Sequence, residues 1–97
     1  MSTAHKIRSI LKIEFKARHL SVHDESSLHA GHAEAMKQGG GHFAVILVSE
    51  VFRGQPLRKR HGLIYDALKP LMGKDIHALQ IRALTPEEFN APGSPIA

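Results

Sequence analysis

The stretch that decides the fold is residues 42–49, which read His-Phe-Ala-Val-Ile-Leu-Val-Ser. Residues 43–48 form the longest apolar run in the chain, so both alternating sets of side chains along this stretch are apolar. A strand with two apolar faces lies inside a sheet or is covered on both sides. We therefore predict a buried strand over residues 42–49.

Two further segments, residues 19–24 and 76–84, alternate between apolar and polar side chains and are predicted to be strands. In the second of them, His77 is expected to share a face with Leu79. Residues 24–41 are long enough to connect the first two strands as a hairpin. A helical crossover joins the second strand to the third, so these two strands should run parallel with a right-handed connection.

Helical spacing predicts the remaining elements. Residues 3–16 form a first helix, residues 50–53 a short helical turn, and residues 56–69 a further helix. The apolar stripe of this last helix is expected to consist of Leu57, His61, Ile64, Leu68 and Leu71. Thr85 caps a final helix, and Glu88 completes its capping box.

The resulting order is α-β-β-α-α-β-α, which is an α/β (α+β) fold with a three-stranded mixed sheet covered by helices on one face. This order resembles the class II form of the KH arrangement. The 97 residues suit a single domain, which we place at residues 1–90 with a flexible tail at 91–97. No run approaches the roughly 18 apolar residues of a membrane span, and the first residues lack a signal pattern. We therefore expect a cytoplasmic protein that does not associate with membranes.

The histidine and cysteine counts restrict the chemistry. The chain has eight histidines and no cysteine. The absence of cysteine excludes disulfides, thiolate nucleophiles and cysteine-based zinc sites. The net charge is +4 with neutral histidines, and it would rise strongly between about pH 8 and 5 as they protonate. This charge permits a nucleic acid or an acidic partner but proves neither.

An enzymatic function is not expected. Asp24 and Glu25 are adjacent, so on a strand their carboxylates point to opposite faces and cannot act as a pair. Ser26, Ser27 and His29 are accompanied by no acid or oxyanion device in the nearby sequence.

Motifs that occur in a fixed order over residues 7–89 resemble the BolA family. They are Asp24-Glu25-Ser26, then Gly41-His42-Phe43, then Val48-Ser49 with Phe52-x-Gly54, then Arg60-His61 with Tyr65, and Ile76-His77-Ala78-Leu79 with Thr85-Pro86-Glu87. Two features depart from the family pattern. Gly62 stands where a second basic residue is usual, and residues 33–38 look like an insert.

The resemblance implies a class II KH-like fold and a complex with a monothiol glutaredoxin in which a [2Fe–2S] cluster is shared. It places the family's cluster-ligand histidine on His77. The second ligand falls on His29, with His32 as the competing candidate. The other ligands would be thiolates of glutaredoxin and glutathione, so the isolated chain would hold no cofactor. Some bacterial members are described as DNA-binding transcriptional regulators that affect stress response and cell shape.

Plainer interpretations of these residues remain open. From spacing alone, His77 is a buried or partly buried structural histidine. His29 and His32 are solvated loop residues or an adventitious zinc or nickel site. The run Arg58-Lys59-Arg60-His61 is either a solvated helix face or a patch that contacts phosphates. The absence of a second glycine after Gly54 and the scarcity of aromatic residues weigh against RNA binding.

The leading hypothesis is therefore a metal-binding adaptor in iron–sulfur or iron homeostasis. It would be a monomer or weak homodimer alone and would bind a monothiol glutaredoxin. The alternative is a DNA-binding transcriptional regulator that uses Arg58, Lys59, Arg60 and His61. A third possibility is an interaction domain whose histidines bind nothing.

Overall fold

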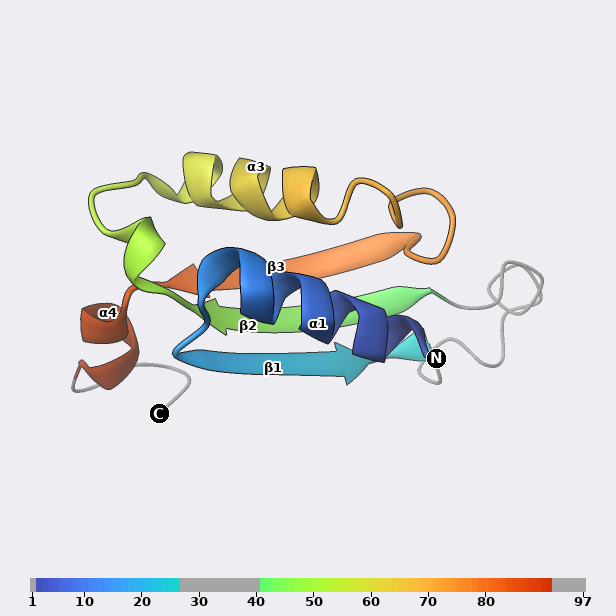
Figure 1. Ribbon diagram of the computed structural model, residues 1–97, viewed down its shortest axis with the longest axis horizontal. Coiled ribbons are helices and arrows are strands. Elements are labelled where there is room, and N and C mark those ends of the chain that lie inside the picture. Colours follow the sequence, from blue (N-terminus) through green and yellow to red (C-terminus); the bar gives the residue numbers. More distant parts are fainter. Residues whose placement is uncertain (1, 27–40, 92–97) are drawn as a thin grey trace.

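The fold is that of a computed structural model, which describes residues 2–26 and 41–91. Figure 1 shows the elements in chain order. These are α1 (Thr3–Phe15), β1 (His19–Asp24), β2 (His42–Val48), the 3₁₀ turn η2 (Glu50–Phe52), α3 (Leu57–Ala67), β3 (Ala78–Leu84) and α4 (Pro86–Asn90). The predicted order is confirmed, and the short turn after β2 is a 3₁₀ helix.

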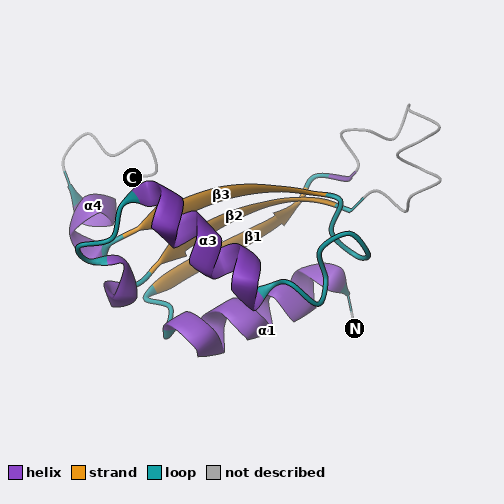
Figure 2. Cartoon of the chain, turned by 90° about the horizontal axis from the view of Figure 1, so that it is seen from above, coloured by secondary structure: helices purple, strands orange, loops and turns teal. Residues whose placement is uncertain are grey.

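The sheet has the order β1-β2-β3, so the stretch with two apolar faces is indeed the central strand. β1 runs antiparallel to β2, with His19 opposite Val48 and Asp24 opposite Phe43. β3 runs parallel to β2, as the helical crossover requires. Figure 2 shows that α1 and α3 lie on the same side of the sheet, which confirms the mixed sheet with helices on one face. The order is compatible with a class II KH-like arrangement.

The core lies between the sheet and these two helices. One face of β2 supplies Phe43, Val45 and Leu47, all at most 4% exposed. The buried residues packed with them from other elements are Ile7, Leu11, Phe15, Phe52, Ile64, Leu68, Ile76 and Ala83. Ala44 and Ile46, on the opposite face of β2, are half-buried. In the described chain, no helix is long and apolar enough to cross a membrane.

The apolar stripe predicted for α3 is wrong at its first turn. Leu57 is 60% exposed, whereas Arg60 is only 7% exposed and takes the inward position together with Ile64. The helix therefore turns a basic residue, rather than Leu57, toward the interior. The reason lies outside the helix, because Glu88 supplies a carboxylate for the buried guanidinium.

Arg60 joins α3 to the last helix. Its Nη1 donates to Glu88 Oε1 at 2.6 Å and to the carbonyl oxygen of Ala83 at 3.0 Å, and its Nε donates to the carbonyl oxygen of Gln55 at 2.7 Å. Glu88 also completes the predicted capping box with Thr85, accepting from the Thr85 N–H at 2.9 Å. One carboxylate thus caps α4 and neutralises a buried cation, and this arrangement holds the C-terminal helix against the domain.

We expect this pair to make stability fall in acid. Hydrogen bonding to Arg60 and to the Thr85 backbone lowers the pKa of Glu88 from its ordinary value of 4.5. Because the folded pKa lies below the unfolded one, the stabilisation is present above about pH 4.5 and is lost as the pH falls through the folded pKa. The difference in unfolding free energy between wild type and Glu88→Gln, measured by urea denaturation, should shrink as the pH falls from 6 to 3. A difference that stays constant over this range would contradict the assignment.

Candidate functional site

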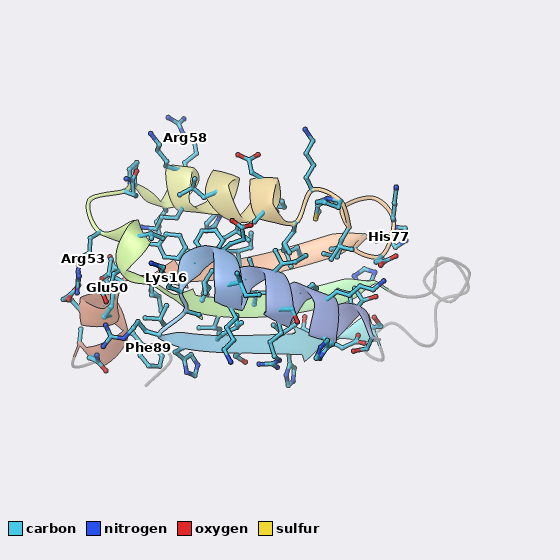
Figure 3. All side chains as sticks on the ribbon, viewed as in Figure 1. Lys16, Glu50, Arg53, Arg58, His77 and Phe89 are labelled. Carbon is cyan, nitrogen blue, oxygen red and sulfur yellow. The ribbon has the colours of Figure 1, made fainter. Side chains whose placement is uncertain are left out.

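His77 occupies an accessible position at the end of the sheet where β2 and β3 begin. Its side chain is exposed, and Figure 3 shows it at this end of the molecule, away from Lys16 and Arg53. The His77 N–H donates to the carbonyl oxygen of Gly41 at 2.8 Å, and the Ala78 N–H donates to the same oxygen at 3.1 Å. The backbone of His77 is therefore held against Gly41, the residue that leads into β2.

The interpretation of His77 as a buried structural histidine on the face of Leu79 is wrong. β3 begins only at Ala78, and Ile76, not His77, is fully buried. A tight turn causes this inversion, because the Ile76 N–H donates to the Leu71 carbonyl and the Gly73 N–H donates to the Ile76 carbonyl. The turn breaks the alternation one residue before the strand and directs the imidazole outward.

Gly41 leaves the space that the His77 ring occupies. Its φ is +69°, and a Cβ at this position would lie 2.7 Å from His77 Cδ2 and 2.9 Å from the carbonyl oxygen of Asp75. Separations below 3.0 Å are not tolerated by real Cβ atoms, so any larger residue must displace the ring or the backbone. The absence of a side chain at Gly41 therefore allows the close approach of His77.

The base of the site is tied to the first helix. Lys6 Nζ lies 3.2 Å from Asp75 Oδ2, in an ion pair between α1 and the turn that precedes His77. Both side chains are more than a third exposed, so the pair contributes little to stability. Its effect is positional, since it connects the turn to a helix that is anchored in the core.

The residues Asp24, Glu25 and Ser26 hold together the two ends of the segment that joins β1 to β2. The Ser26 N–H donates to Asp24 Oδ1 at 2.9 Å, and hydrogen bonding with the Ser26 side chain and then with this backbone N–H lowers the pKa of Asp24. Ser26 Oγ accepts from the His42 N–H at 3.3 Å, and the Glu25 N–H donates to the His42 carbonyl at 2.7 Å. The first motif of the sequence thus closes the connection beside His77, a role that its residue types alone did not reveal.

His29 and His32 lie outside the described residues, so the choice between them stays a prediction. Within residues 2–26 and 41–91, no group of three or more His, Asp or Glu side chains could hold a metal ion. His77 would therefore need further ligands from residues 27–40 or from another molecule. An exposed imidazole next to the start of β2 fits such a shared site.

The basic run at the start of α3 does not form one surface. Arg58 and Lys59 are exposed, but Arg60 is buried against Glu88 and is not available to a phosphate. His61 is half-buried and lines a groove with Leu57 of the same helix, which continues over the strand residues Ala44, Ile46, Gln80 and Arg82. The predicted four-residue patch thus reduces to two exposed cations beside a groove that contains Arg82.

Fold and site together define a small α+β domain with a basic helix start and an accessible histidine, His77, at the end of its sheet. Residues 11–88 match the family described as "BolA-like protein". The chain belongs to the BolA family.

Individual relatives agree with this assignment. SufE-like protein 1 of Arabidopsis thaliana is 43% identical over 91 residues, which are 90% of this chain but only 24% of that protein, so the chain spans about a quarter of it. The DNA-binding transcriptional regulator BolA of Escherichia coli is 33% identical over 92% of this chain and 81% of its own length. The solved structure of BolA1 from Arabidopsis thaliana aligns with a TM-score of 0.81 at 36% identity, over 95% of this chain and 98% of that one.

Proposed function

We propose that this chain is an adaptor that binds a monothiol glutaredoxin and co-ligates a shared [2Fe–2S] cluster through His77 and one of His29 and His32. The carrying observation is the exposed His77 imidazole, held beside Gly41 at the point where residues 27–40 rejoin the sheet. His77, and either His29 or His32 from the segment that precedes Gly41, would then bind a partner's cluster at the same end of the domain.

The chemistry of the donor set supports sharing. The chain has no cysteine, so thiolates for a cluster would come from glutaredoxin and glutathione. Imidazole ligands raise the reduction potential of a [2Fe–2S] centre and make it depend on pH. In this arrangement, His77 binds through a ring nitrogen while its main chain stays hydrogen-bonded to Gly41.

The decisive variant is His77→Ala. Titrating a cluster-loaded monothiol glutaredoxin with wild-type chain should change the visible absorption and circular dichroism of the cluster. With His77→Ala, the change should be lost, because the anchored imidazole is gone. His61→Ala, which alters a half-buried histidine on α3, is the matched control and should behave as wild type.

Two results would overturn the proposal: an unchanged glutaredoxin spectrum on mixing with wild type, or a His77→Ala titration that matches wild type. His29→Ala and His32→Ala, tested in the same way, identify the second ligand. The second ligand is the histidine whose replacement abolishes the change in the glutaredoxin spectrum.

A second candidate function is DNA binding. It is supported by the exposed Arg58 and Lys59 beside the groove that contains Arg82, and by relatives in Escherichia coli and Haemophilus influenzae named DNA-binding transcriptional regulators. Arg60 takes no part in this surface, because it is buried against Glu88.

The test is the salt dependence of binding to a fluorescent DNA duplex. Changing Arg58 and Lys59 together to alanine should weaken binding and reduce the slope of log affinity against log salt by about 2, since each phosphate contact contributes about 0.9. Lys12→Ala, which removes an exposed cation from α1, is the control. Failure of the wild-type chain to bind duplex DNA at about 50 mM salt would exclude this function.

A further inference from the structure

A second groove lies on the helical side of the domain, between the C-terminal half of α1 and α3. Its lining consists of Glu14, Phe15, Val51, Leu63, Asp66, Ala67 and Pro70. The two helices that border it are on the same side of the sheet in Figure 2. None of its residues belongs to the site around His77 or to the basic start of α3.

The groove exposes apolar side chains that the core does not use. Val51 is 48% exposed and Leu63 is 37% exposed. On α3, Leu63 and Ala67 follow the spacing i, i+4 and form a ridge beside the inward-facing Ile64, and Pro70 continues the lining in the turn after the helix. A ridge of this spacing is the surface that a packed helix presents to another helix.

The two carboxylates of the groove have no cationic partner within the described chain. Four other acidic residues are paired: Asp75 with Lys6, Glu50 with Arg18 and Arg53, Glu87 with Arg53, and Glu88 with Arg60. Asp24 and Glu25, at the end of β1, also form no ion pair within the described residues, but they do not line the groove. Glu14 and Asp66 make no such pair among residues 2–26 and 41–91. In a chain of net charge +4, acidic groups left unpaired beside exposed apolar residues offer a complementary surface to a cation.

We propose that this groove docks a basic amphipathic helix of a partner protein. Aliphatic residues on one face of that helix would pack between Val51 and Leu63, and Lys or Arg residues at its flanks would meet Glu14 and Asp66. A second copy of this chain fits less well. A two-fold interface through this groove would set Glu14 and Asp66 of each copy against those of the other.

The α1 end of the groove lies away from the His77 site. Lys16, which directly follows α1, and His77 are in different parts of the molecule in Figure 3. The helix-binding groove would give this domain a second partner in addition to the one at His77. This proposal does not depend on cluster binding.

The test uses a designed helical peptide as the probe. It carries leucines at i, i+4 and i+7 flanked by lysines, and its twin carries glutamates in place of the lysines. Titration into the ¹⁵N-labelled full chain should give saturable shifts at Glu14, Val51 and Leu63 with the lysine peptide. The glutamate twin should bind at least about tenfold more weakly, a difference of 1.4 kcal/mol.

Matched variants locate the contact. Leu63→Ser should weaken binding about tenfold, whereas Leu57→Ser should not, although it changes a still more exposed leucine on the same helix. The double change Glu14→Lys and Asp66→Lys should reverse the preference toward the glutamate twin. Circular dichroism verifies that each variant is folded.

Three outcomes would overturn the proposal. The first is equal binding of the two peptides, and the second is equal weakening by Leu63→Ser and Leu57→Ser. The third is self-association of the free chain in light scattering that Leu63→Ser abolishes, which would assign the groove to a second copy of the chain.

Discussion

Replacing Arg60 by alanine is expected to lower the free energy of unfolding by about 3 kcal/mol. Removing one partner of a buried ion pair costs about 3–5 kcal/mol, and the lower end applies because the Glu88 side chain is 46% exposed. The change also leaves the carbonyl oxygens of Gln55 and Ala83 without the donor that each has in the folded chain. Both the start of α3 and the attachment of α4 would be weakened.

Urea denaturation followed by circular dichroism measures this loss. Arg58→Ala is the matched control, since it removes an exposed arginine two residues earlier on the same helix and should change stability by no more than about 0.5 kcal/mol. Arg60→Met keeps most of the side-chain volume and separates lost packing from the lost ion pair. A loss below about 1 kcal/mol for Arg60→Ala would show that the guanidinium does not hold the two helices together.

Replacing Gly41 by alanine should both destabilise the domain and displace His77. An L-residue in the left-handed region costs about 1–2 kcal/mol, and the added Cβ would meet His77 Cδ2 at 2.7 Å. The His77 ring would have to move away, which should change its NMR chemical shifts and remove the NOE between the ring and residue 41. If the proposed function holds, the variant should also weaken the spectral change with cluster-loaded glutaredoxin.

Gly54→Ala is the matched control for this prediction. Gly54 has a similar φ of +74°, but no atom lies within 4 Å of an added Cβ. Gly54→Ala should lose only the free energy that an L-residue costs at positive φ. The additional loss of unfolding free energy in Gly41→Ala therefore measures the steric clash with His77. Equal losses in the two variants, with an unmoved His77 ring, would show that Gly41 does not position the histidine.

Much of the fold could be predicted because local patterns encode it. The two apolar faces of residues 42–49 predicted a strand that lies inside a sheet or is covered on both sides, and the first alternative is confirmed. The helical crossover predicted that β3 runs parallel to it, which is also confirmed. Thr85 and Glu88 form the predicted capping box because its two hydrogen bonds involve only residues three apart. Signals of this kind need no knowledge of distant neighbours.

The candidate site was less predictable, because its arrangement depends on contacts between distant residues. Helical periodicity placed Leu57 inside and left Arg60 in a basic run. Instead, Arg60 turns inward because it bonds to the carboxylate of Glu88, which is 28 residues away in the sequence but adjacent in the fold. Alternation placed His77 on the inner face, but the turn at Gly73 buries Ile76 and exposes the imidazole. The inward position of Arg60 has no signal in the neighbouring residues, whereas the exposure of His77 follows from a local turn in which Gly73 and Leu71 bond to Ile76.

The sequence by itself determined the buried strand, the mixed sheet, the capping box of α4 and the absence of cysteine, so that the thiolates of any cluster would come from a partner. Each of these depends on residue type and on spacing over a few positions. Only the tertiary structure decided that Arg60 is structural, that Gly41 makes room for His77, and that Glu14 and Asp66 border an apolar groove. The physical reason is that a side chain's role depends on what folding places against it, and those neighbours come from separate elements.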